Sequence, residues 1–177
     1  DWDLTHIAGC DLLIDATADN RSLNLVSAAA NSAKKPVVWL EIFAGGIGGM
    51  VARSRPTLDP SPQEIRARVD AWCLDQGMAA PKTMNDYGME PGANGTPVYA
   101  ADADVTSIAA HGARLALDIL IGREPSFFPV SAYLIGLAPG WLFEQPFQTF
   151  AIDVGPAPPE QEKSPPDQAT IDKVIAM

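Results

Sequence analysis

The stretch that decides the fold is Leu12-Leu13-Ile14-Asp15-Ala16-Thr17-Ala18-Asp19-Asn20-Arg21, followed by Lys34-Lys35-Pro36-Val37-Val38-Trp39. Residues 12–14 form a short apolar run between two aspartates, which is typical of a central parallel strand buried on both faces. Asp19 suits the N-cap of a helix that ends at the two lysines before Pro36. Residues 37–43 predict the next strand. The stretch therefore predicts a strand–helix–strand unit with a right-handed crossover.

Polar side chains gather in the loop between the first strand and the helix. Asp15, Thr17, Asp19 and Asn20 all follow the strand directly. Open α/β sheets bind ligands at the carboxyl ends of their strands. The loop is therefore the first place where we expect a ligand.

The remaining chain predicts further elements of both kinds. Ser61-Pro62-Gln63-Glu64 reads as a capping box with proline at the first helical position. Gly112 lies in the apolar stripe of a later helix, where close packing against a neighbour would explain it. We expect a turn at 45–46, a loop over 55–62, a long loop over 78–97, helices over 62–76 and 103–121, and strands over 47–53, 131–137, 141–144 and 147–153.

Two parts of the chain are distinguished by composition. Residues 1–155 are expected to form one α/β unit, and residues 156–177 a proline-rich tail with a short helix over 168–177. The 177 residues carry 22 acidic and 12 basic side chains, a net charge of -10, which argues against nucleic-acid or membrane binding. No spanning segment, signal sequence or disulfide framework is visible, so we expect a cytoplasmic location.

The segment Asp15–Arg21 resembles the "D-A-T-D-N" motif of the ThiF/MoeB/HesA family, the ubiquitin-activating-like (E1-like) enzymes. Residues 101–122 resemble the family's late helix, which helps to form a dimer. Residues 131–137 together with 140–147 resemble the tail of bacterial ThiF-domain proteins in ubiquitin-like gene sets. The resemblance implies a Rossmann-like mixed sheet with flanking helices, the C-terminal half of an E1-like adenylation domain. It also implies that ATP and Mg²⁺ are used to adenylate the C-terminus of a ubiquitin-like or sulfur-carrier protein.

The resemblance also implies roles for single residues. In the family, the aspartate before the asparagine binds magnesium-ATP, and this role carries over to Asp19. Ala18 departs from the motif as an apparent extra residue, so Asp15 is a second candidate. Asn20 and Arg21 are candidates for contacts with phosphate or ribose, and the equal alternative is that they form a solvated first turn of the helix. The alternative for Asp19 is that it only caps the helix.

Cys73 has two interpretations. Family members often use a cysteine in this region to take the activated carrier as a thioester, and a thiolate suits that step. However, Cys73 shares an apolar stripe with Val69 and Trp72, which favours packing. Cys10 is expected to be structural and His111 to pack in a core. The chain contains no C-x-x-C pair, so no zinc is expected.

Three functional classes remain. The first is part of an E1-like enzyme, inactive alone because the glycine loop for phosphate would lie upstream of these residues. Gly45-Gly46-Ile47-Gly48-Gly49 does not supply that loop, because Val51 breaks G-x-G-x-x-G and the run lies between two strands. The second is a non-catalytic dimerisation or scaffold module, in which a dimer covers an exposed sheet edge. The third, an NAD-dependent oxidoreductase, lacks its dinucleotide fingerprint.

Overall fold

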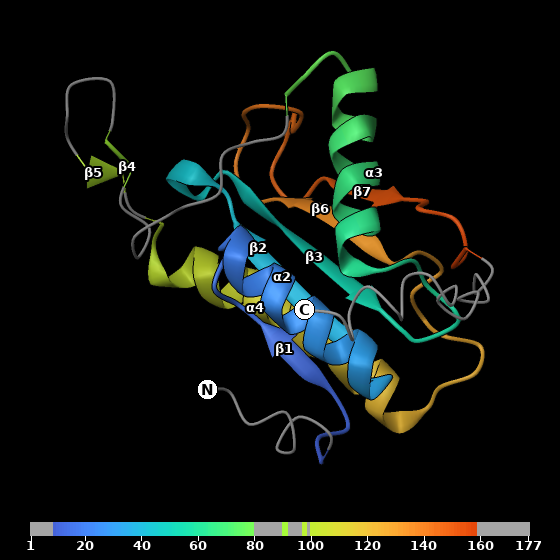
Figure 1. Ribbon diagram of the computed structural model, residues 1–177. Helices are drawn as coiled ribbons and strands as arrows, with labels where there is room; N and C mark the ends of the chain where they lie inside the picture. The colour runs from blue at the N-terminus through green and yellow to red at the C-terminus, as the bar shows by residue number, and fades with distance from the viewer. Residues whose placement is uncertain (1–8, 80–89, 92–96, 99, 159–177) are drawn as a thin grey trace, which may run out of the picture.

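The computed structural model describes residues 9–79, 90–91, 97–98 and 100–158 (Figure 1). The fold is a mixed α/β arrangement around a five-stranded sheet in the order β1-β2-β3-β6-β7. β1 and β2 are parallel, and each later neighbour is antiparallel to the one before it. The strands are β1 (Leu13–Asp15), β2 (Val37–Ile42), β3 (Gly48–Ser54), β6 (Ala132–Gly136) and β7 (Thr149–Ile152).

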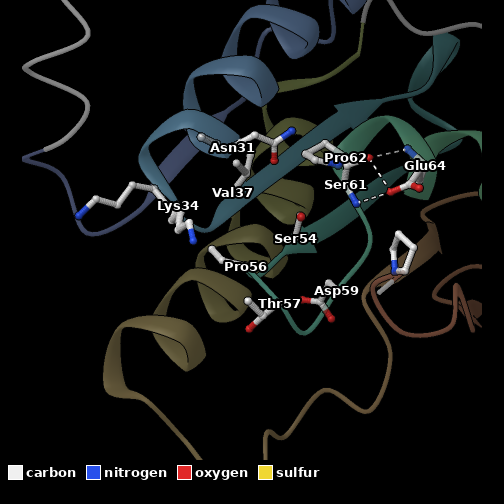
Figure 2. A pocket seen from close by; sticks show the side chains of 13 residues that line it. Asn31, Lys34, Val37, Ser54, Pro56, Thr57, Asp59, Ser61, Pro62 and Glu64 are labelled. Carbon is white, nitrogen blue, oxygen red and sulfur yellow. Dashed lines mark hydrogen bonds between the residues drawn. The ribbon is translucent and has the colours of Figure 1, made fainter. Parts of the chain in front are cut away.

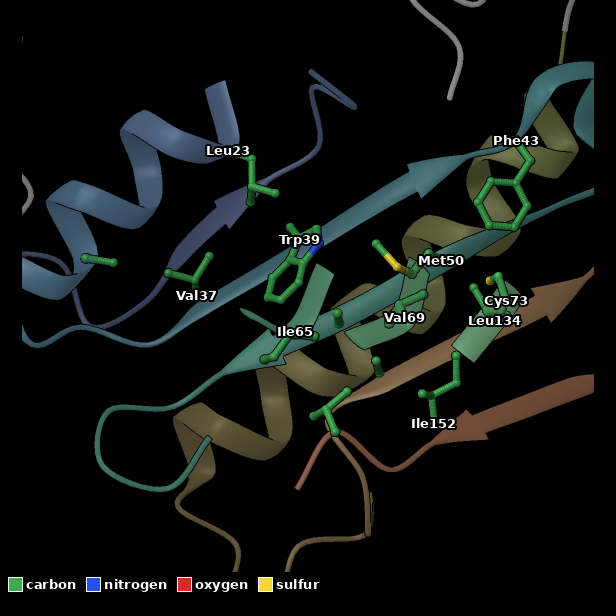
Figure 3. Packing of buried hydrophobic residues seen from close by; sticks show 14 of the residues in the cluster. Leu23, Val37, Trp39, Phe43, Met50, Ile65, Val69, Cys73, Leu134 and Ile152 are labelled. Carbon is green, nitrogen blue, oxygen red and sulfur yellow. The ribbon is translucent and has the colours of Figure 1, made fainter. Parts of the chain in front are cut away.

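Helices cover both faces of this sheet (Figure 1). They are α2 (Asn20–Ala33), α3 (Pro62–Asp75) and α4 (Asp102–Ile121), with a short 3₁₀ turn η1 (Ala44–Gly46) and a separate pair β4 (Glu90–Pro91) and β5 (Pro97–Val98). α2 and α3 pack on one face, where Trp39, Ile65 and Leu134 are fully buried (Figure 3). α4 packs on the other face through Ile108 and Leu115. The sheet therefore separates two apolar cores.

The helix ends follow the signals in the sequence. Asp19 caps α2, and Ser61 and Glu64 form the reciprocal capping box at the start of α3. Gly122 ends α4 in the left-handed conformation that glycine adopts without strain. These three predictions are confirmed.

Gly112 lies where α4 crosses the sheet. A Cβ atom built at this position would sit 2.8 Å from Cδ2 of Leu40 on β2. The glycine therefore allows α4 to approach the strand closely, as the sequence indicated.

Two predictions about strands were wrong. β1 is an edge strand among the described residues, and Ile14 is 58% exposed on it, so residues 12–14 are not buried on both faces. Residues 141–144 form turns with one isolated bridge between Gly140 and Phe143. There the aromatic side chains pack against one another, since Trp141 stacks edge-on with both Phe43 and Phe143.

Some expectations lie outside the described residues. These are the short helix over 168–177 and most of the loop over 78–97. Of the helices in the described ranges, none has the length and apolar character needed to cross a bilayer.

Candidate functional site

Asp15 organises the loop at the carboxyl end of β1. Its carboxylate is 5% exposed, and Oδ1 accepts hydrogen bonds from the Thr17 backbone N–H at 2.9 Å and from Thr17 Oγ1 at 2.7 Å. Ala18, the apparent extra residue, takes the left-handed conformation with φ 54°. The loop thereby turns from the strand into α2 around a fixed aspartate.

Asp19 occupies the N-cap of α2. Its Oδ2 accepts a hydrogen bond from the Ser22 backbone N–H at 2.8 Å, and the side chain is exposed to solvent. The hydrogen bonds from Ser22 hold the pKa of Asp19 below its ordinary value. Asn20 and Arg21 are exposed on the first turn of the same helix. The structure thus gives Asp19 the capping role and leaves its carboxylate accessible to a ligand.

Glu41 is a residue that the sequence analysis missed. It lies on β2 on the same face as Trp39, whose partner across the parallel ladder is Asp15. The side chain of Glu41 is 6% exposed and pairs with Arg66 of α3, which also donates from Nε to Asp70 at 3.2 Å. A single carboxylate within the apolar run Val37–Ile42 was the signal that could have found it.

The surroundings of Glu41 leave one of its oxygens unsatisfied. Oε2 is buried and has no hydrogen-bond partner within the described ranges, and the same is true of Trp39 Nε1. Burial raises the pKa of the Glu41 carboxyl; the Arg66 guanidinium opposes this rise, and the charges of Asp70 and Asp15 add to it. The charges of Asp15 and Asp70 therefore reach Glu41 near the carboxyl end of β2.

The carboxylates at this edge of the sheet are few. No group of three or more His, Cys, Asp or Glu side chains suited to a metal occurs in the part of the chain that the structure describes. Mg²⁺ in nucleotide sites is usually held by one or two carboxylates, with phosphates and water completing the shell. The exposed carboxylate of Asp19 could serve as one carboxylate of such a site, whereas Asp15 is 5% exposed and its Oδ1 accepts two hydrogen bonds from Thr17.

Cys73 lies inside the core between α3 and the sheet. Its thiol is 0% exposed and packs in the same cluster as Ile65 and Val69 (Figure 3). Burial and the charge of Asp70 raise the pKa of Cys73 to about 11. These properties favour packing, because reactive cysteines are accessible and have lowered pKa values.

The other two candidate structural residues differ from each other. Cys10 is exposed, so its expected structural role is not one of burial. His111 is partly buried on α4, and this burial lowers its pKa.

A cavity of about 240 Å³ lies where α2 ends and α3 begins (Figure 2). Asn31 and Lys34 reach it from the end of α2, and Ser61 and Glu64 from the start of α3. The loop between β3 and α3 closes one side through Thr57 and its neighbours. The cavity and the loop at Asp15 are therefore separate sites at the two ends of α2.

Comparison with known proteins assigns no family to the chain. No protein-family model matches it, and no curated protein matches its sequence. The roles of Asp15, Asp19 and Glu41 therefore rest on their geometry and chemistry.

Proposed function

We propose that this chain is part of an E1-like adenylyltransferase that activates the C-terminus of a ubiquitin-like or sulfur-carrier protein. The observation that carries the proposal is the placement of two carboxylates, Asp15 and Asp19, around the carboxyl end of β1 and the start of α2. The strand–loop–helix arrangement agrees with the motif in Asp15–Arg21. We also propose that the enzyme is cytoplasmic and acts as a homodimer. The proposal includes no zinc site.

The proposed reaction joins a carboxylate oxygen of the carrier to the α-phosphorus of ATP and releases pyrophosphate. Mg²⁺ would neutralise charge on the triphosphate. Asp19 would hold the metal through the carboxylate oxygens left accessible by its capping bond, and Asn20 and Arg21 would contact phosphate or ribose. Asp15 would fix the loop through Thr17, so that Asp19 is presented at one position.

Cys73 was the candidate for taking the activated carrier from the adenylate as a thioester. A thioester at this residue would require α3 to move, because the thiol is fully enclosed in the core. The proposed function therefore assigns the adenylation step to the chain and does not use Cys73 in it.

The test is binding of magnesium-ATP by calorimetry, first to the 177 residues and then to the complete protein encoded by the gene. Asp19→Asn is the informative variant, because asparagine still caps a helix while the negative charge is removed. We expect at least a tenfold loss of affinity in this variant. Asp102→Asn, on the exposed first turn of α4, is the matched control and should bind as the wild type does.

Two results would overturn the proposal. One is equal affinity in the wild type and Asp19→Asn, which would leave Asp19 as a helix cap alone. The other is the absence of nucleotide binding to the complete protein. Pyrophosphate exchange with a candidate carrier then tests the chemistry, and we expect none from the 177 residues alone.

A second candidate function is a dimerisation or scaffold module. It is favoured by apolar side chains exposed on the last turns of α4, where Leu117, Leu120 and Ile121 are 56%, 54% and 64% exposed. Exposed apolar patches often mark protein contacts. Sedimentation of Leu120→Glu, compared with the similarly exposed Leu25→Glu on α2, tests this surface. We expect the wild type and Leu25→Glu to sediment as dimers and Leu120→Glu to sediment as a monomer. A scaffold module would form this dimer without binding nucleotide.

A further inference from the structure

The cavity between the end of α2 and the start of α3 has its own chemistry, independent of the loop at Asp15 (Figure 2). Its volume of about 240 Å³ is below the roughly 300–1,000 Å³ of pockets that hold drug-sized ligands. A ligand that fits it would therefore be small. The charges on its walls indicate which kind of small molecule it would be.

Both carboxylates on the wall are already engaged by neighbouring groups. Asp59 accepts from Arg55 Nε at 2.7 Å and from Ser131 Oγ at 2.6 Å. Glu64 accepts from the Ser61 backbone N–H at 2.9 Å and from Ser61 Oγ at 2.8 Å. Arg55 also pairs with Asp59, and the charge of Arg68 acts on Glu64, so a cation of this chain already opposes each of the two negative charges.

The two lysines on the wall differ from the two acids, because no opposite charge pairs with them among the described residues. Neither Lys34 nor Lys35 has an ion-pair partner within residues 9–79, 90–91, 97–98 and 100–158. Lys35 is half-buried, so part of its side chain is already withdrawn from water. Asn31 and Thr57 add an amide and a hydroxyl that can donate hydrogen bonds.

From this arrangement we infer that the cavity is a binding site for a compact oxyanion, a phosphate or carboxylate group held by Lys34 and Lys35. The ammonium groups supply charge, and Asn31 and Thr57 supply directional hydrogen bonds.

The two lysines could also act only by stabilising the end of α2, and the test must distinguish this role from anion binding. Cations near the last turn of a helix stabilise it by interacting with its negative end, and Lys34 is the C-cap of α2. That role requires no ligand. It predicts that removing a lysine lowers stability equally with and without added anion.

The experiment is a titration of the ¹⁵N-labelled chain with inorganic phosphate, followed by amide chemical shifts at constant ionic strength. A second titration with acetate distinguishes phosphate from carboxylate recognition, and chloride serves as the blank. We expect saturable shifts confined to the end of α2 and the loop between β3 and α3. Lys35→Gln should weaken phosphate binding at least tenfold.

Arg114→Gln is the matched control, since Arg114 is an exposed cation on α4, which packs on the other face of the sheet. It should bind phosphate with the affinity of the wild type, and the dispersed spectrum of each variant confirms that it is folded. Shifts that do not saturate, that also appear with chloride, or that Lys35→Gln leaves unchanged would overturn the inference. Binding to phosphate alone or to acetate alone supports it and identifies the oxyanion.

Discussion

Arg53 on β3 and Asp118 on α4 form an ion pair between the sheet and α4, with 3.1 Å between Nη1 and Oδ2. Their side chains are 1% and 4% exposed. Arg53 also donates to Ser126 Oγ at 2.9 Å and to the Phe128 carbonyl oxygen at 2.7 Å. The pair therefore ties the sheet, α4 and the segment that follows α4 into one unit.

Breaking this pair should destabilise the protein strongly. Arg53→Met removes the buried cation of the pair and leaves Asp118 only the partly exposed Arg123, whose Nε lies 3.4 Å from Oδ1. Removing one partner of a buried ion pair costs about 3–5 kcal/mol. Urea denaturation of the variant measures the loss in the free energy of unfolding. The double variant with Asp118→Asn should lose less than the sum of the two single changes, and a loss below about 1 kcal/mol in Arg53→Met would contradict the assignment.

Asp59 should make the stability of the protein depend on pH. Burial opposes its ionisation, but hydrogen bonds from Arg55 and Ser131 outweigh this and hold its pKa below the ordinary value of 3.8. Because the folded pKa is the lower one, the stabilisation is present above about pH 4 and is lost as the pH falls through the folded value.

Asp59→Asn tests this dependence. At pH 7 we expect the variant to be less stable by about 2–3 kcal/mol, since charged hydrogen bonds are lost and Arg55 stays partly solvated. The gap between wild type and variant should narrow below pH 4. A gap that stays constant from pH 7 to pH 3 would show that the charge of Asp59 contributes nothing.

Two glycines should respond differently to the same substitution. At Gly136 an added Cβ would lie 2.6 Å from Cγ of Phe143, whose ring is buried and stacked on Phe150. Gly136→Ala should therefore cost about 1–3 kcal/mol through overpacking. At Gly112 the obstacle is the flexible end of Leu40, and the helix gains about 1 kcal/mol from alanine.

We accordingly expect the free energy of unfolding of Gly112→Ala to remain within about 1 kcal/mol of the wild-type value. The gain in helix propensity offsets the cost of the close contact with Leu40. Thermal unfolding of both variants under one set of conditions gives the comparison. Equal losses at the two positions would contradict this account of their neighbours.

The thiol of Cys73 should be unreactive in the folded protein. It is enclosed in the core and its pKa is raised to about 11, so little thiolate is present at neutral pH. Titration with a thiol reagent should modify Cys10 alone under native conditions and both cysteines in denaturant. The Cys10→Ser variant isolates Cys73, and its rapid native modification would restore the nucleophile hypothesis.

Local signals in the sequence were sufficient to predict much of the fold. The apolar runs, the capping box at Ser61 and the glycine after Ile121 each depend on residues close together in the chain. The unit β1–α2–β2 follows from the same kind of information. The position of β1 at an edge does not, because an apolar run of three residues looks the same beside one strand or between two.

The parts that could not be predicted depend on distant residues. Glu41 is buried and pairs with Arg66, which lies 25 positions later in the chain. No residue close to Glu41 in the sequence indicates this partner. Residues 141–144 have the composition of a strand, but Trp141 takes a left-handed conformation with φ 53° and packs against Phe43. For Cys73 the sequence showed only that the residue lies on an apolar stripe of its helix. It did not show that the thiol is fully buried.

The helix α2 places the two candidate sites at its opposite ends. Its 14 residues make a stiff rod about 21 Å long, and Leu23, Ser27 and Ala30 pack along it as one stripe. A shift of this rod along its axis would displace the loop at Asp19 and the wall at Lys34 together. Linkage then requires reciprocity: an oxyanion at Lys34 that changes the affinity for a ligand at Asp19 must have its own affinity changed by the same factor.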